Sequence, residues 1–229
     1  MGRGYPTAKL EAGQVSLFGL PLAADGVPHI VATLLFTILL TVFFGPWGAL
    51  IGLALFGLTI NFFRDPPRRP PDDPRAVVAP ADGKVIQIHE LHDERFFQAP
   101  ATRLSIFMSP LDVHVNRIPW SGKVLDVRYH PGKFFRAFAD KASLDNEQTA
   151  VLVEDDDGRR VWFVQIAGFV ARRIVCRVSP GDTVVRGQRY GMILFGSRAD
   201  VYFPAGSVDV TVRVGDRTRA GETVVARWR

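Results

Sequence analysis

Residues 151–166 read VLVEDDDGRRVWFVQI, and their pattern indicates the fold class of most of the chain. Two apolar runs rich in β-branched and aromatic residues, 151–153 and 161–166, flank an acidic turn that ends at Gly158. Such an arrangement predicts a β-hairpin. Similar short apolar runs, each bounded by turn residues, recur at 85–88, 104–108 and 123–127. From residue 77 onward the sequence therefore predicts a mainly β domain, a barrel or a sandwich with few short helices.

An internal echo near the C-terminus extends this prediction. Gly181-Asp182 precedes Gly187-Gln188, and Gly215-Asp216 precedes Gly221-Glu222 with the same spacing of six residues. The echo resembles the hairpins of lipoyl- and biotinyl-like β-barrels, although two ordinary tight turns explain the same glycines. No lysine occupies the position that would accept lipoate or biotin, so a carrier domain is not expected. Helices are expected over Phe134–Lys141 and Phe169–Val175, the second range being equally compatible with a strand.

The N-terminal part of the chain has a different character. Residues 26–63 contain no Lys, Arg, Asp or Glu, and 24 of the 34 residues from Ile30 to Phe63 are apolar. Gly45-Pro46 interrupts the segment, and proline ends or kinks a helix. Each half would be roughly 22–26 Å long as a helix, which is short of the ~30 Å hydrocarbon core of a bilayer. A helical hairpin that enters one leaflet fits best; two short spans, one kinked span and a buried core hairpin are the alternatives.

The charges around this segment suggest an orientation and a domain boundary. Basic residues stand before it and after it: Arg3, Lys9, Arg64, Arg68 and Arg69. The positive-inside rule would place both ends at the cytoplasmic face of the cell membrane. Residues 64–76 are rich in proline and predict an extended, semi-rigid linker. We therefore expect a membrane-associated helical segment over 1–63, the linker over 64–76 and a β-rich domain over 77–229.

Composition limits the chemistry of the chain. It has 229 residues, 47% of them apolar, with a mean hydropathy of +0.10, a formal net charge of +5 and a pI near 9.7. These values argue against disorder and allow an anionic partner, whether nucleic acid, a lipid surface or an acidic substrate. A single cysteine excludes an intramolecular disulfide framework and a cysteine-clustered metal site. His89 and His92 are three residues apart, but the local pattern is strand and loop, and neither a third His nor a Cys follows at metal spacing, so no metal site is expected.

Two positions could carry chemistry. His114 lies in a stretch where polar and apolar residues alternate, so Asp112, His114 and Asn116 would share one face if the chain were extended there. Ser197 follows Gly196 directly after an apolar run at 192–195. A serine hydroxyl in such a turn can attack the preceding glycine carbonyl, because glycine has no Cβ to block the approach. A structural histidine and an ordinary Gly-Ser turn are the alternatives.

Taken together, the motifs resemble the phosphatidylserine decarboxylase family in its short bacterial and archaeal form. The matching stretches are, in order, 62–66 (FFRDP), 80–85 (PADGKV), 112–117 (DVHVNR), 141–143 (KAS), 145–147 (DNE), 165–168 (QIAG), 171–174 (ARRI) and 195–201 (FGSRADV). Each motif alone is weak, but their order over roughly residues 60–225 is specific. The hydrophobic N-terminus is also similar to that of the family.

The resemblance implies a lyase made by self-cleavage of a zymogen. Ser197 would attack the Gly196 carbonyl, and elimination with loss of ammonia would leave a covalent pyruvoyl group derived from Ser197. The products would be a β chain, 1–196, and an α chain, 197–229, which remain together as a heterodimer. The pyruvoyl group would form a Schiff base with phosphatidylserine in the membrane and release CO₂ and phosphatidylethanolamine. A homo-oligomer is compatible with this picture, and nucleic acid is not expected as a partner.

The resemblance also implies roles for particular residues. Asp82, His114 and Ser197 match a catalytic set for self-cleavage similar to the Asp-His-Ser triad of serine proteases. Where longer members have a second histidine, this chain has Arg117. We therefore expect His114 to act as general base or as proton donor after decarboxylation, and Arg117 to bind a substrate carboxylate or phosphate unless it forms a structural ion pair. The alternatives are a membrane-tethered, non-catalytic β-barrel binding module and an ordinary serine hydrolase.

Overall fold

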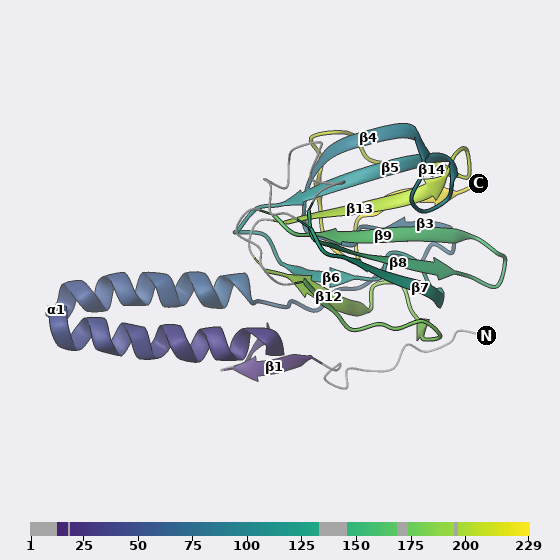
Figure 1. Ribbon diagram of the computed structural model, residues 1–229. Coiled ribbons are helices and arrows are strands. Elements are labelled where there is room, and N and C mark those ends of the chain that lie inside the picture. The colour runs from purple at the N-terminus through teal and green to yellow at the C-terminus, as the bar shows by residue number, and fades with distance from the viewer. Residues whose placement is uncertain (1–12, 18, 133–145, 169–173, 195–196) are drawn as a thin grey trace. The chain divides into compact units, whose positions relative to one another are not determined.

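The computed structural model describes residues 13–17, 19–132, 146–168, 174–194 and 197–229 (Figure 1). The chain divides into two compact units, Met1–Pro67 and Arg68–Arg229. The helix expected over Phe134–Lys141 lies outside the described residues, as does most of Phe169–Val175. The end of that second range belongs to a strand, Ile174–Cys176.

The second unit is built almost entirely of strands, which confirms the mainly β fold class. Its strands are β3 (Ala76–Val78), β4 (Gly83–Asp93), β5 (Ala99–Met108), β6 (Val115–Arg117), β7 (Gly122–His130), β8 (Gln148–Glu154), β9 (Arg160–Ile166), β10 (Ile174–Cys176), β11 (Thr183–Val184), β12 (Arg189–Ile193), β13 (Ser197–Pro204), β14 (Val208–Val210), β15 (Arg217–Thr218) and β16 (Val224–Trp228). They form a curled sheet in the order β11-β7-β8-β9-β13-β5-β4-β15 and two three-stranded sheets, β10-β12-β6 and β14-β16-β3. Figure 1 shows β4, β5, β13, β9, β8 and β7 beside one another.

The hairpin expected from residues 151–166 is formed by β8 and β9. Val153 pairs with Val161 and Glu154 with Arg160, in an antiparallel register. The acidic turn is held by Asp155, whose carboxylate accepts hydrogen bonds from the backbone N–H groups of Asp157 and Arg159 at 3.0 and 2.8 Å. Alternate residues of these strands face one core, where Val151, Val161 and Phe163 are buried. Period-two patterning thus predicted this element correctly.

The internal echo also corresponds to a repeated structure. The N–H of Gly181 and the carbonyl of Asp182 both hydrogen-bond to Val124 of β7 at 2.8 Å. Gly215 and Asp216 make the same two hydrogen bonds with Val85 of β4, at 2.8 and 2.9 Å. The strands that follow, β11 and β15, are the two edges of the eight-stranded sheet. The echo is therefore a repeat of the fold, as the spacing indicated.

The first unit contains a short hairpin, β1 (Gln14–Leu17) with β2 (Leu20–Ala23), a 3-10 turn, η1 (Ala24–Gly26), and α1 (Val27–Phe62). The helix is broken at Gly45, where φ is 58° and ψ is −140°, so α1 is a helical hairpin of two antiparallel arms (Figure 1). A positive φ at this position favours glycine. The break falls at the expected Gly45-Pro46 site.

The helical hairpin presents apolar side chains outward. Segment 24–62 is long and apolar enough to cross a membrane, and at its tip Val42, Phe43 and Trp47 are each more than 70% exposed. All four threonine hydroxyls of α1 donate hydrogen bonds to carbonyls four residues earlier; these are Thr33, Thr37, Thr41 and Thr59. Polar groups satisfied within the helix suit apolar surroundings on every side.

Small residues allow the two arms to approach closely. Gly48 and Gly52 form a Gly-x-x-x-Gly pattern, and an added Cβ at Gly52 would lie 2.7–2.9 Å from atoms of Thr37. We expect Gly52→Ala to destabilise the helical hairpin by about 1–3 kcal/mol through overpacking. Gly57→Ala is the matched control, since an added Cβ there meets no described atom within 4 Å. Thermal unfolding in detergent, followed by circular dichroism, measures both; equal effects at the two positions would contradict the packing.

The proline-rich stretch after the first unit is bound to the β-rich unit from Arg68 onward. The guanidinium of Arg186 donates hydrogen bonds to the carbonyls of Pro71, Asp73 and Ala76, at 2.8, 2.6 and 2.5 Å. Asp73 also forms an ion pair with Arg227 at 2.8 Å. The second part of the proline-rich stretch is thus held by side chains that are distant in sequence. The predicted linker boundaries at 63/64 and 76/77 stay predictions.

Candidate active site

Ser197 is the first residue of β13, and the strand is held on both sides. It pairs with Met108 of β5, and the next residue, Arg198, pairs with Phe107 of β5 and Ile166 of β9. The side chain of Ser197 is fully buried, and its Oγ lies 3.9 Å from the sulfur of Met108. Gly196, the other half of the expected cleavage site, lies outside the described residues. Ser197 is thus placed by strand pairing rather than by a strong hydrogen bond of its own.

Two buried carboxamides are connected to the sulfur that the serine meets, one directly and one through a hydrogen bond. The Nδ2 of Asn116 is 3.6 Å from the same Met108 sulfur, and Asn116 Oδ1 accepts a hydrogen bond from Gln165 Nε2 at 2.9 Å. Gln165 also donates to the carbonyl of Val175, at 3.2 Å. This bond to Gln165 fixes which end of the Asn116 amide faces Met108. Gln165 was not among the predicted site residues. The sequence feature that could have identified it is a glutamine at a core-facing position of the apolar run 161–166.

His114 is fully buried directly before β6. Its Nδ1 lies 2.9 Å from the backbone carbonyl of Asp112. A carbonyl only accepts hydrogen bonds, so Nδ1 carries the proton and Nε2 is the basic nitrogen of the neutral ring. The structure differs from the expected shared face, because Asp112 lies in a turn and its carboxylate caps Ser109 at 2.7–2.8 Å. Asp112 therefore orients His114 through its backbone.

Asp82 is buried and tied to the C-terminal segment. One oxygen accepts the N–H of Ala220 at 2.7 Å, and the other forms an ion pair with Arg68 at 2.8 Å. Burial raises the pKa of Asp82, although the Ala220 hydrogen bond and the Arg68 charge oppose this effect. Among the described residues, no hydrogen bond joins Asp82 to His114 or Ser197. The catalytic role of the three residues stays a prediction.

Arg117 is buried in β6 and faces one of the echoed turns. Its guanidinium donates a hydrogen bond to the carbonyl of Gly187 at 2.9 Å, and its backbone N–H donates to Pro80. A buried guanidinium bound to a carbonyl stabilises the local fold. The contact supports a structural role, and substrate binding by Arg117 stays a prediction.

Arg68 provides the positive charge for two carboxylates, Asp82 and Glu222. Partial burial works to raise the pKa of Glu222, but hydrogen bonds from Arg68 and the Arg69 backbone outweigh it and lower that pKa. For Asp82, whose folded pKa is raised, the contribution to stability is full below its unfolded pKa of about 3.9 and declines as pH rises through the folded pKa. For Glu222, stability is gained above its unfolded pKa and lost as pH falls.

Removing the Arg68 charge should therefore lower the free energy of unfolding most at neutral pH. We expect Arg68→Met to reduce the free energy of unfolding by about 2 kcal/mol at pH 7, because a buried carboxylate loses its partner, and by less at pH 4. Urea unfolding at the two pH values measures the difference. The matched control is Arg69→Met, since the Arg69 side chain is exposed. A deficit that is larger at pH 4 would contradict the assignment.

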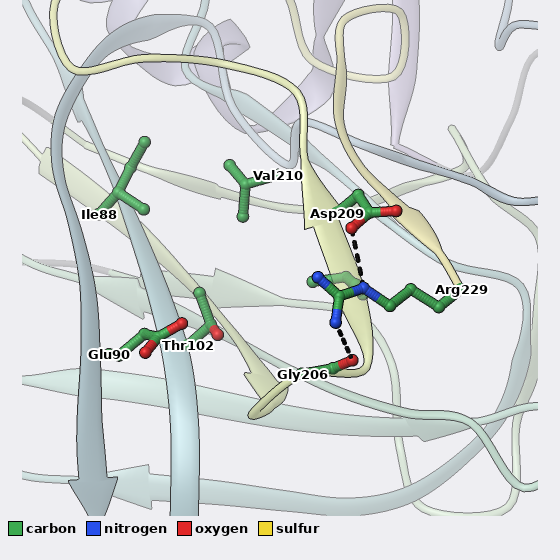
Figure 2. A pocket seen from close by; sticks show the side chains of 8 residues that line it. Ile88, Glu90, Thr102, Gly206, Asp209, Val210 and Arg229 are labelled. Carbon is green, nitrogen blue, oxygen red and sulfur yellow. Dashed lines mark hydrogen bonds and ion pairs between the residues drawn. The ribbon is translucent and has the colours of Figure 1, made fainter.

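A separate cavity of about 360 Å³ opens beside β14 (Figure 2). Arg229 lies along it and bonds to Asp209 Oδ1 at 2.8 Å and to the Gly206 carbonyl at 3.1 Å. Ile88 and Val210 contribute apolar surface. None of the predicted site residues lines this cavity. Within the described part of the chain, no three His, Cys, Asp or Glu side chains gather as a metal site, and the expected absence of a metal stays a prediction.

Comparison with known proteins places the site in a matched region. The family model described as phosphatidylserine decarboxylase matches residues 55–226. A phosphatidylserine decarboxylase proenzyme of Syntrophus aciditrophicus is 46% identical over 88% of this chain and 95% of its own length. Proteins of the same name from Geobacter metallireducens and Chlorobium luteolum are 46% and 49% identical, over 90% and 76% of this chain and 95% and 81% of their own lengths. The matched region includes Asp82, His114, Arg117 and Ser197.

Proposed function

This chain belongs to the phosphatidylserine decarboxylase family, and from that premise we propose that it converts phosphatidylserine to phosphatidylethanolamine and CO₂. The observation that carries the proposal is the position of Ser197. It starts a strand that is paired on both sides, directly after Gly196, and its hydroxyl lies in a buried site. Ser197 itself pairs with Met108 of β5, and pairing on the second side begins at Arg198, so the nucleophile has little freedom to leave a reactive geometry.

Self-cleavage needs groups of this chain and one water molecule. The hydroxyl oxygen of Ser197 forms a bond to the Gly196 carbonyl carbon while the C–N bond breaks, which yields an ester and a free amine. Removal of the Ser197 α-proton then breaks the Cβ–O bond and releases the carboxylate of Gly196. The dehydroalanine left at residue 197 becomes an imine when its Cβ takes up a proton. One water molecule then hydrolyses the imine, which releases ammonia and leaves a ketone at residue 197. The electron pairs and protons balance without an added oxidant or metal.

The surroundings of Ser197 fit a pyruvoyl group derived from it. The Ser197 hydroxyl is in contact with a thioether sulfur at 3.9 Å, a weak acceptor, so little hydrogen bonding is lost with the hydroxyl. The side chain is buried, which suits an uncharged group of similar size. When formed, this group supplies an electrophilic carbonyl that binds the substrate amine and takes up the electron pair left by CO₂.

His114 is the candidate for moving protons in this site. Its Nδ1 proton is held by the Asp112 carbonyl, which leaves Nε2 as the acceptor. We assign Nε2 as the general base for self-cleavage or, in its protonated form, as the donor to the carbon that loses CO₂. The hydrogen bond from Gln165 orients the Asn116 amide against the Met108 sulfur that the Ser197 hydroxyl also meets.

Cleavage would leave two chains that remain joined by their strands. The 33-residue α chain would contain β13, β14, β15 and β16, and three of these pair with strands of the β chain: β13 with β5 and β9, β15 with β4, and β16 with β3. Ion pairs also cross between the chains, including Arg68–Glu222 and Arg227–Asp73. This pairing supports a stable heterodimer.

The apolar helical hairpin supports a membrane location. A diacyl lipid substrate stays in the bilayer, and a hairpin of two short apolar arms keeps the enzyme at that surface. Basic residues at both ends of the segment favour the cytoplasmic face.

The proposal is tested with vesicles that contain phosphatidylserine. Purified chain should separate into two fragments under denaturing conditions, with the 33-residue fragment blocked at its N-terminus. The same preparation should release CO₂ and form phosphatidylethanolamine. Purified, lipid-bound protein that remains a single intact chain and releases no CO₂ would overturn the proposal.

A further inference from the structure

An ion pair without any solvent exposure lies one residue beyond Ser197. Arg198 Nε contacts Asp200 Oδ1 at 2.6 Å, and Arg198 Nη2 contacts Asp200 Oδ2 at 3.0 Å, so the pair is bidentate. Both side chains are 0% exposed. Burying two charges is costly unless their geometry is good and further hydrogen bonds satisfy them. A pair of this kind at the start of β13 therefore needs an explanation.

The same guanidinium also contacts side chains of β5 and β4, the two strands on one side of β13. Arg198 Nη2 donates to Ser105 Oγ of β5 at 2.6 Å and lies 3.1 Å from Gln87 Oε1 of β4. Ser105 is itself fully buried. Ser105 and Gln87 precede the Gly196–Ser197 bond, whereas Arg198 and Asp200 follow it. Cleavage at that bond would put the two ends of these hydrogen bonds on different chains.

We propose that Arg198 is a positioning residue that holds residue 197 in register after the chain has been cut. This inference rests on the proposed self-cleavage. In the uncut chain, residue 197 is held by the peptide chain on both sides. After the cut it is a chain terminus, and termini fray unless they are tied down. Arg198 is then the residue directly after the new terminus, and it is anchored to Ser105 and Gln87 of the other chain.

The consequence differs between the two reactions of the protein. Self-cleavage occurs while residue 197 is still held from both sides, so it needs the anchor less. Decarboxylation needs residue 197 in place at a new chain end, where a displacement of about 1 Å can cost up to 10²-fold in rate. Groups that bind the rest of the lipid are not moved. Loss of the anchor should therefore lower kcat and leave KM and self-cleavage nearly unchanged.

The sharpest test removes the contacts between the chains and keeps the ion pair. In the double variant Ser105→Ala, Gln87→Leu, the Arg198–Asp200 pair remains. We expect complete self-cleavage, KM within about twofold of the wild-type value and kcat lowered about tenfold on phosphatidylserine vesicles. The matched control is Arg227→Gln, which removes an ion pair between the two chains, to Asp73, near the other end of the α chain. It should leave kcat within about twofold.

A second variant keeps the proposal testable if the double variant does not fold. Arg198→Lys keeps a positive charge beside Asp200 but lacks the planar fork that reaches Ser105 and Gln87 together, so the same selective loss of kcat is expected. Unchanged kcat in fully processed variants would overturn the proposal, as would a failure of self-cleavage equal to the loss of kcat. Failure of the proposed function is distinct, because there the wild-type chain would neither cleave nor release CO₂.

Discussion

Replacing Ser197 with alanine is expected to leave a single intact chain and to abolish decarboxylation. The methyl group cannot attack the Gly196 carbonyl, so neither the cut nor the pyruvoyl group can form. The fold should survive, because the only hydrogen bond that the described residues make with the Ser197 hydroxyl is to a sulfur at 3.9 Å, and losing so weak a bond costs less than about 1 kcal/mol. Denaturing electrophoresis and intact mass report the cut, and CO₂ release from phosphatidylserine vesicles reports the activity.

Ser207→Ala is the matched control for this experiment. Ser207 also lies in the α chain, and its hydroxyl donates a hydrogen bond only to the local carbonyl of Pro204, at 2.7 Å. This variant should be cut and should decarboxylate like the wild-type chain. Decarboxylation by uncut Ser197→Ala protein would show that residue 197 does not provide the reactive group.

Replacing His114 with glutamine is expected to slow the chemistry by about 10²–10⁴-fold, the range for loss of a general acid or base. Glutamine is similar in size, and its amide can still donate to the Asp112 carbonyl that now holds Nδ1. It has no basic nitrogen to replace Nε2. The rate of fragment formation after synthesis and the rate of CO₂ release by the processed protein are measured separately, since His114 can serve either reaction.

The two rates separate the roles of His114. Slow cutting identifies the base for self-cleavage, and normal cutting with slow CO₂ release identifies the proton donor of decarboxylation. His130→Gln is the control, because His130 is exposed at the end of β7. Wild-type rates for both reactions in His114→Gln would show that His114 has no catalytic role in either reaction.

Local patterns predicted much of the fold. The alternation around the acidic turn at 155–158 predicted β8 and β9, because side chains of a strand face opposite sides in turn. Gly45-Pro46 predicted the break in α1, because proline cannot continue the hydrogen bonding of a helix. The equal spacing of the two Gly-Asp turns predicted a repeated element of the sheet. Each prediction rests on residues close together in the chain.

The candidate site was predicted only in part. Ser197, His114 and Asp82 were proposed from motifs, and the structure buries all three. It also ties Asp82 to Arg68 and Ala220. Asn116, which accepts a hydrogen bond from Gln165, meets the same Met108 sulfur as the Ser197 hydroxyl. Asp112 was expected on the face of His114, but a turn at Ser109 removes it from the extended stretch.

The mainly β unit, the helical hairpin and a serine after glycine in a family-specific order of motifs could all be predicted from the sequence, because these features depend on neighbouring residues. Which side chains meet across the sheet depends on the three-dimensional fold. Arg198 reaches Ser105 and Gln87, which are 93 and 111 residues away, because the register of β13 against β5 and of β5 against β4 brings them together. A register shift of one residue would turn Arg198 to the opposite face of the sheet. No local pattern encodes that choice, which is settled by the packing of the whole sheet.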